Sequence, residues 1–333
     1  MTEPSDPSQA NDASQTISAI SAAALLRVGI IGAGAVGNAL LAALGARGAV
    51  AGLRAEAVAS RTFSHARAAA RRVAGCAALD SLDALAARCD VVFIATSDDA
   101  IQPVAETVAW RRGQAVAHLS GAQGVTPLAG AAARGALVAA LHPLMTFPRA
   151  LRAAPPAQML ERLAGASWAL ECADTTLAAR LTRFIAALEG RVITLTEQDR
   201  APYHLSGVLA SNYLVTLLGA ATDLWAGWGI GRDDALRALL PLARATIENL
   251  EAVGLPAALT GPIARGDVGA VRIHEDWLRA HAIGDDSSGD GDDSVALRDA
   301  YAALGRLTLP LAREKGALDA ATAEAMRRAL DDA

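Results

Sequence analysis

A short apolar run followed by a glycine-rich turn opens the patterned part of the chain. Residues 28–31, Val-Gly-Ile-Ile, have the length and β-branched character of a buried parallel strand. Apolar side chains then recur at helical spacing, at Val36, Leu40, Leu41 and Leu44. The pattern therefore predicts a strand, a turn and a helix in that order, which is the context of a dinucleotide-binding fingerprint.

The turn carries the spacing G-x-G-x-x-G, in which each glycine has a physical reason. Gly32 permits the tight turn, Gly34 lets the backbone approach a pyrophosphate, and Gly37 lets the helix pack on the strand. Amide groups and the positive end of the helix dipole then face the phosphates. We predict cofactor contacts at Gly32, Ala33, Gly34, Ala35, Val36 and Gly37. Since the chain has 29 glycines, the alternative is a glycine-rich turn without a ligand.

Strands and helices continue to alternate as far as residue 195. Predicted strands cover 55–59, 90–95, 115–118, 136–141, 167–171 and 191–195, and predicted helices cover 64–73, 81–88, 100–110, 126–135 and 175–189. This alternation predicts an α/β fold with a doubly wound, mostly parallel Rossmann sheet over residues 25–195. From residue 196 only helices follow, at 200–228, 234–253, 267–281, 295–314 and 319–330. We therefore predict an all-α C-terminal domain over 196–333, which carries further candidates for substrate binding.

Two segments lack any such pattern. Residues 1–24 are small and polar, without the basic start and apolar core of a secretory signal, and they predict a disordered tail. Residues 284–294 are acidic and glycine-rich, and they predict a mobile loop.

Composition excludes several classes of function. The net charge of -5 gives no basic footprint for nucleic acid, and no apolar run approaches the ~20 residues of a membrane span. Apolar residues make up 53% of the chain, enough for a large core. Cys76, Cys89 and Cys172 have no metal-binding spacing, and three isolated thiols fit the cytoplasm. We expect a cytoplasmic protein without a metal site.

Small polar residues follow the predicted strands where a cofactor would lie. The strand at 55–59 ends in Ser60-Arg61-Thr62, at the position where an acidic residue would bind the ribose of NAD. An arginine fork fits a phosphate, so we expect NADP rather than NAD. His65 is a further candidate at this phosphate, and its alternative, which the sequence favours, is an ordinary residue in the first turn of the next helix. The alternative for Arg61 is a solvated loop residue. Thr96-Ser97 follows the next strand and is also predicted to border the cofactor crevice.

A nicotinamide enzyme needs a group that gives or takes a proton near the reacting atom. Ser120 with His118, and His142 with Thr146, follow two strand ends, where ligands bind in open α/β sheets. We predict that Ser120 orients the substrate and that His142 contributes to catalysis or binds an anion. Both histidines have the alternative of being inert residues at a strand end or turn.

The long helix after residue 196 offers further candidates. Tyr203-His204 and Ser211-Asn212 lie in an apolar sequence, and seven residues are nearly two turns, which places His204 and Ser211 on one face. We predict His204 as the acid/base, Asn212 as an orienting group and Ser211 as a substrate contact. The alternative is a polar pair that bridges helix and sheet.

The stretch 259–267, LTGPIARGD, predicts a shaped loop between two helices. Arg265 within it is free to hold an anionic substrate. The alternative is a plain helix–helix turn in which Asp267 caps the next helix.

Five motifs together resemble a known family. They are GAGAVG at 32–37, HLSGA at 118–122, HPLMTF at 142–147, ASNYL at 210–214 and LTGPIARGD at 259–267. This combination resembles a bacterial family of NADP-dependent oxidoreductases that joins a Rossmann-like domain to a helical C-terminal domain of unknown function. The resemblance covers about residues 26–315. It implies a fold related to 6-phosphogluconate dehydrogenase, pyrroline-5-carboxylate reductase and prephenate dehydrogenase, and a homodimer formed through the helical domain.

The lysine count separates branches of that superfamily. Lysine-dependent relatives such as 6-phosphogluconate dehydrogenase carry a lysine on the first long helix of the second domain, whereas the single lysine here is Lys315. The histidine-based pattern is more similar to prephenate-type sites. We expect hydride transfer between NADP(H) and a small carboxylated alcohol/ketone or amine/imine. The alternatives are a non-catalytic NADP-binding sensor or scaffold and a deazaflavin-linked NADP reductase.

Overall fold

The computed structural model describes residues 25–282 and 291–331, and the chain divides into two compact units between Asn212 and Tyr213. The predicted tail at 1–24 and most of the predicted acidic loop lie outside the described residues. Residues 291–294 belong to helix α13 (Gly291–Glu314), so that end of the loop prediction is wrong.

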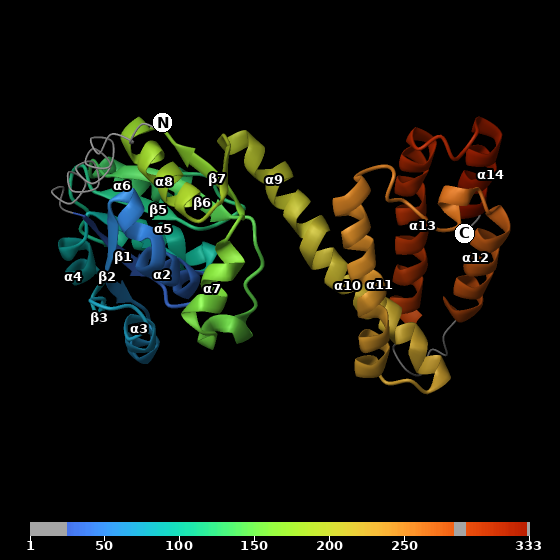
Figure 1. Ribbon diagram of the computed structural model, residues 1–333, viewed down its shortest axis with the longest axis horizontal. Helices are drawn as coiled ribbons and strands as arrows, with labels where there is room; N and C mark the ends of the chain where they lie inside the picture. Colours follow the sequence, from blue (N-terminus) through green and yellow to red (C-terminus); the bar gives the residue numbers. More distant parts are fainter. Residues whose placement is uncertain (1–24, 283–290, 332–333) are drawn as a thin grey trace, which may run out of the picture. The chain divides into compact units, whose positions relative to one another are not determined.

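An eight-stranded sheet forms the first unit (Figure 1), and its order is β3-β2-β1-β4-β5-β6-β7-β8. Neighbouring strands are parallel except β6 and β7, which are antiparallel. The predicted doubly wound, mostly parallel sheet is therefore confirmed. The strands are β1 (Leu26–Ile31), β2 (Leu53–Ala59), β3 (Ala77–Leu79), β4 (Val91–Ile94), β5 (Ala115–His118), β6 (Leu137–Pro143), β7 (Ser167–Cys172) and β8 (Arg191–Thr194).

Helices cover both faces of this sheet because successive strand residues point to opposite sides. Val91 and Phe93 of β4 pack in one apolar cluster, and Val92 and Ile94 pack in another. The first cluster also contains residues of α2 (Ala35–Arg47), α3 (Phe63–Ala70), α7 (Pro156–Leu163) and α8 (Thr175–Ala187). The second contains residues of α4 (Leu82–Arg88), α5 (Asp98–Thr107) and α6 (Ala129–Ala133).

Helix starts depend on local side chains, as the helices predicted at 81–88 and 126–135 show. Ser81 is the N-cap of α4, because its hydroxyl accepts the Ala84 N–H at 3.2 Å. Thr126 is not a cap, because its hydroxyl instead donates to Glu197 at 3.1 Å and the segment begins as the 3₁₀ turn η2 (Thr126–Leu128).

One continuous helical segment of 32 residues, Glu197–Trp228, contains the division between the units. Its parts are η4 (Glu197–Asp199), α9 (Arg200–Gly207), the π-helical segment η5 (Val208–Asn212), α10 (Tyr213–Asp223) and η6 (Leu224–Trp228). The division thus falls later than the predicted boundary at 196. Among the described residues this is the one helix that is long and apolar enough to cross a membrane by length and composition, although polar residues such as Ser211 and Asn212 interrupt its apolar sequence. A single helix of this kind is weak evidence for a membrane span.

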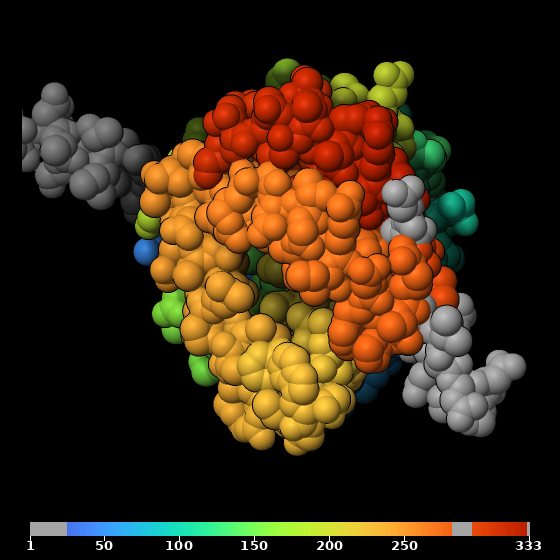
Figure 2. Space-filling model, turned by 90° about the vertical axis from the view of Figure 1, so that its right-hand side faces the viewer, coloured from blue at the N-terminus to red at the C-terminus, as the bar shows by residue number. Residues whose placement is uncertain are grey.

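The second unit is helical, as predicted. Helices α12 (Val268–Ala282), α13 and α14 (Ala320–Asp331) lie side by side (Figure 1), and their orange and red atoms adjoin in Figure 2. They share a small core that includes Val271, Leu309 and Met326. Helix α11 (Arg232–Val253) packs against α10 but buries only Ala235. The α10–α11 pair therefore leaves most of its apolar side chains exposed.

Candidate dinucleotide-binding site

The glycine turn lies where the sheet changes its winding direction. β1 has β2 on one side and β4 on the other, and ligands of open α/β sheets bind at this switch point. Gly32 has φ +115°, and a β-carbon there would overlap the carbonyl group of Ala95. A β-carbon at Gly37 would overlap the carbonyl oxygen of Gly32. Both positions therefore require glycine for the turn and for the packing of α2 on it.

Gly34 differs from its neighbours because space beside it is open. It is exposed, and a β-carbon added there would have no atom within 4 Å. The buried Asn38 fixes the turn, since its amide donates to the carbonyls of Ala33 at 3.1 Å and Gly34 at 2.8 Å. The first N–H groups of α2 follow Gly34 and have no acceptor within the helix. The turn thus presents a rigid set of donors to an open surface, as anion binding requires.

The loops after β2 and β4 flank this turn. The Gly32 N–H donates to the carbonyl of Ala59, the last residue of β2, at 2.8 Å, which brings Ser60-Arg61-Thr62 alongside the glycines. Arg61 is exposed, and no carboxylate pairs with it within the described residues. On the other side, Thr96 and Ser97 follow β4. The structure therefore brings the predicted cofactor residues together at one edge.

Ser120 and His118 form a closed hydrogen-bond network at the end of β5. The Ser120 hydroxyl donates to Asp98 at 2.8 Å and accepts the N–H groups of Ala122 and Gln123 at 3.2 Å. His118 is fully buried, accepts the Ser120 N–H on Nδ1 and donates from Nε2 to the carbonyl of Gly124 at 2.6 Å. Burial lowers the pKa of His118, which keeps the ring neutral in this arrangement. Both side chains shape the loop at 120–124, and a substrate contact by Ser120 stays a prediction.

His142 makes its principal polar contact with Tyr203, which extends from α9. The Tyr203 hydroxyl lies 2.8 Å from His142 Nδ1, and the two rings meet edge to face. Burial lowers the pKa of His142 to about 4, with the positive charges of His204 and Arg200 acting in the same direction. Burial also raises the pKa of Tyr203 to about 12, so this hydroxyl stays protonated and donates to Nδ1. His142 is therefore neutral at pH 7, carries its proton on Nε2, and cannot attract an anion by charge.

Arg200 is a buried cation that the sequence reasoning missed. It is 2% exposed, and it donates to Glu171 at 3.3 Å and to the carbonyl of Ala140 at 3.2 Å. Arg200, Tyr203 and Gly207 recur at helical spacing on α9, and this face turns toward the sheet. The spacing places these three residues on one face, but the sequence alone does not show that this face, rather than that of His204, packs on the sheet.

The polar candidates farther along the helix are more exposed. His204 and Asn212 are exposed, and Ser211 is half-buried. Ser211 and Asn212 stand in the π-helical segment, whose i→i+5 bonds enclose more residues than an α-turn. The seven-residue spacing from His204 therefore no longer corresponds to two α-helical turns. Segments of this type are frequent at functional sites, and the roles of these residues stay predictions.

Two candidates belong to the second unit. Arg265 is exposed in a loop shaped by Gly261 and Gly266, both with positive φ, and Asp267 caps α12 through the Ala270 N–H at 3.0 Å. The Lys315 ammonium donates to the carbonyls of Ala257 at 3.0 Å and Leu259 at 2.7 Å. Lys315 thus holds a loop, and the roles of Arg265 stay predictions.

Two family models match successive parts of the chain. A Rossmann-like domain matches residues 9–143, and a domain of unknown function, DUF2520, matches residues 166–308. The chain joins a Rossmann-like domain to a DUF2520 domain. The resemblance inferred from the sequence is therefore confirmed. The DUF2520 match begins before the division at Asn212 and includes β7, β8 and the whole helical segment 197–228.

Solved structures share the fold at low sequence identity. A Bacteroides fragilis protein named as a "putative NADP oxidoreductase" is 21% identical, with a TM-score of 0.59, over 82% of this chain and 96% of that one. A Thermotoga maritima protein is also 21% identical, with a TM-score of 0.58, over 81% and 94% of the two chains. A Plasmodium falciparum pyrroline carboxylate reductase with NADP bound is 11% identical, with a TM-score of 0.51, over 92% and 98%. No curated protein matches the sequence.

Proposed function

We propose that the chain is an NADP-dependent oxidoreductase whose first unit binds the dinucleotide at the carboxyl edge of its sheet. The observation that carries this proposal is the open glycine turn at Gly34, which stands at the switch point between β1 and β4. The donors at the start of α2 would hold the diphosphate. The NADP-bound reductase of the same fold supports this choice of cofactor.

Preference for NADP over NAD rests on the loop after β2. Arg61 stands where an acidic residue would bind the 2′-hydroxyl of NAD, and its guanidinium lacks a carboxylate partner among the described residues. Ser60 and Thr62 add two hydroxyls beside it. These groups supply the donors that a 2′-phosphate requires.

The proposed reaction is hydride transfer between NADP(H) and a small carboxylated alcohol/ketone or amine/imine. The nicotinamide supplies or accepts the hydride when bound. In the reductive direction, the substrate oxygen or nitrogen takes the Nε2 proton of His142, while Nδ1 takes the phenolic proton of Tyr203. The buried charge of Arg200 lowers the cost of the resulting phenolate, which solvent then reprotonates.

This assignment favours His142 and Tyr203 over the exposed His204 as the proton-transfer pair. His204 remains the alternative acid/base, since its charge is close enough to affect His142. Ser211 and Asn212 remain the proposed contacts to the substrate, and the binding of an anion by Arg265 of the second unit stays a prediction. Ser120 contributes by shaping the loop at 120–124, whose Gly121 packs against the His142 ring.

We further propose a homodimer formed through α10 and α11. A helix in water must bury its apolar stripe against another element, and among the described residues α11 buries only Ala235. Val215 and Leu217 of α10 and Leu242 and Ile247 of α11 are exposed to between 41% and 71%. A second copy of the chain would cover them.

Thermal unfolding with NADPH or NADH tests the cofactor assignment. A ligand that binds the folded state raises stability by mass action, so NADPH should raise the melting temperature more than NADH does. Arg61→Ala should weaken NADPH binding more than NADH binding. No shift with either nucleotide would refute the proposed function, and equal losses in the variant would remove Arg61 from the 2′-phosphate site.

A turnover assay distinguishes an enzyme from a sensor that only binds NADP. Oxidation of NADPH is followed at 340 nm with a panel of small keto acids and cyclic imino acids. The proposal expects turnover with at least one carboxylated substrate. Tight NADPH binding without hydride transfer to any member would favour the sensor.

A further inference from the structure

A second basic segment reaches the loop that carries Arg61. The 3₁₀ turn η3 (Arg149–Ala153) follows β6 in the sequence, far from β2, yet Arg152 Nη1 lies 3.3 Å from His65 Nδ1. His65 stands in the first turn of α3, directly after Ser60-Arg61-Thr62. The chain therefore places an arginine from each of two remote segments around the start of α3.

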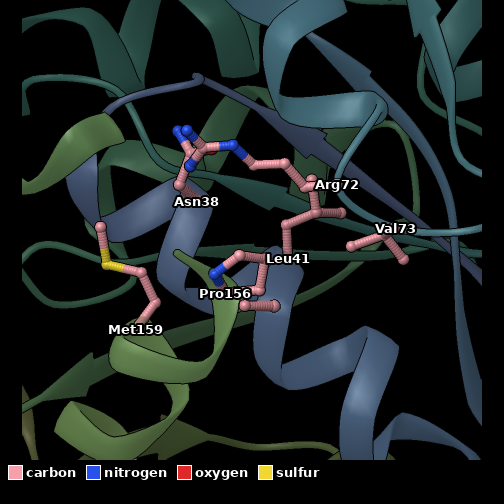
Figure 3. A pocket seen from close by; sticks show the side chains of 7 residues that line it. Asn38, Leu41, Arg72, Val73, Pro156 and Met159 are labelled. Atoms are coloured by element: carbon pink, nitrogen blue, oxygen red, sulfur yellow. The ribbon is translucent and has the colours of Figure 1, made fainter. Parts of the chain in front are cut away.

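Arg72 fixes η3 in this place. Its guanidinium donates to the carbonyls of Arg152, Ala153 and Ala154, each at 3.1 Å. Figure 3 shows the Arg72 side chain extending across the seam between α2 and α7 toward Asn38, the residue that holds the glycine turn. Three hydrogen bonds from one planar group define the position of a loop closely. The approach of Arg152 to His65 is therefore anchored to the body of the first unit.

The groups in this cluster are suited to a dianion. An arginine can only donate, so His65 accepts on Nδ1 and presents its proton on Nε2. Arg152 keeps further N–H groups available, and within the described part of the chain no carboxylate pairs with Arg61 or Arg152. The Thr62 hydroxyl makes no cap bond to α3. Exposed arginines without acidic partners, beside hydroxyls and an imidazole N–H, form a surface complementary to phosphate.

We propose that Arg152 is a specificity-determining residue that completes the 2′-phosphate site together with Arg61 and His65. The inference rests on the proposed function, because it assigns the ligand as the 2′-phosphate of bound NADP(H). It goes further by adding η3, a segment outside the glycine turn and the β2 loop, to the nucleotide site. Arg72 is then a positioning residue that holds η3 in reach.

The test uses probes that isolate the 2′-phosphate. Binding of 2′,5′-ADP and of 5′-AMP to the full chain is measured by calorimetry at low salt, alongside NADPH and NADH. Arg152→Gln removes the charge, and Arg149→Gln is the matched control, because Arg149 lies on the same exposed turn without a contact to His65. Losing one charge-assisted pair at an exposed site is expected to weaken 2′,5′-ADP and NADPH about tenfold in Arg152→Gln. Binding of 5′-AMP and NADH should change less than about twofold, and Arg149→Gln should resemble the wild type.

The outcomes distinguish this inference from the proposed function. Unchanged 2′,5′-ADP and NADPH binding in Arg152→Gln would overturn the inference and leave the proposed function intact, provided that the wild type binds NADPH. An equal loss in Arg149→Gln would also overturn it, because general charge rather than position would be the cause. A wild type that binds neither NADPH nor NADH would refute both. If Arg152→Gln does not fold, Arg152→Lys serves in its place, with a smaller loss confined to the same two probes.

Discussion

At the scale of single residues, the proposed proton transfer depends on the hydrogen bond between Tyr203 and His142. We expect Tyr203→Phe to lower kcat about 100-fold, the lower end of general acid–base effects, because Nδ1 of His142 loses its proton source. His204→Gln is the matched control on the next position, and it should retain activity within about threefold. The measurement is NADPH oxidation with the substrate found in the panel. The reverse ranking of the two variants would return the acid/base role to His204.

The buried His142 ring also predicts how stability depends on pH. Its pKa is about 4 in the folded chain and near 6.5 when unfolded, so the unfolded state binds more protons between these values. Stability is then complete above pH 6.5 and falls as the pH drops toward 4, by on the order of 1–3 kcal/mol from this residue. The buried His118 acts in the same direction. Urea unfolding at pH 7.5 and pH 4.5 should show a smaller loss in His142→Asn than in the wild type, and parallel losses would contradict the assignment.

At the scale of elements, two glycines of the turn are expected to have different roles, Gly34 in binding the ligand and Gly37 in folding. Gly34→Ala adds a methyl group into open space and should keep stability within about 1 kcal/mol, the size of an N-cap effect, while it abolishes measurable NADPH stabilisation. Gly37→Ala is the contrasting variant, since its methyl group would overlap the Gly32 carbonyl and should destabilise the first unit. Chemical unfolding and NADPH thermal shifts give both quantities. Normal NADPH binding by Gly34→Ala would argue against a diphosphate at this turn.

The sequence predicts these elements well where periodicity and length are sufficient. Strand β5 has its predicted bounds, and β2 and β4 differ only at their ends, because buried parallel strands leave near-continuous apolar runs. The three-residue β3 and the turn η3 leave no such signal, since contacts with β2 and with Arg72 define them. The meeting of the glycine turn with the loops after β2 and β4 was predictable, because the carboxyl ends of parallel strands share one edge, while their contacts to a cofactor stay a prediction. The contact of Tyr203 with His142 could not be predicted, because it depends on which face of α9 packs on the sheet.

At the scale of the whole molecule, the pattern of apolar residues predicts that the second part of the chain is helical. It does not predict where the two compact units divide. A boundary at 196 follows from the last strand, whereas the compact units separate inside one helix, between Asn212 and Tyr213. Contacts across elements decide that division, and no periodicity in a continuous helix reveals it. The same helix carries polar residues that are candidates for the site and also a long apolar surface. This apolar surface explains why the helix has the length and composition of a membrane span.

The proposed dimer would cover the exposed apolar side chains of α10 and α11 without requiring a membrane. Light scattering should give the mass of two chains for the wild type, and Val215→Asp should give that of one, because a charge at a 71% exposed apolar position opposes burial. Val50→Asp is the control, since Val50 is 63% exposed on η1 (Gly48–Ala51) of the first unit and should leave the dimer intact. Both variants should retain the NADPH thermal shift if the nucleotide lies wholly on the first unit. A monomeric wild type, or one that co-sediments with lipid vesicles through this helix, would instead show that a second copy is not what covers α10 and α11.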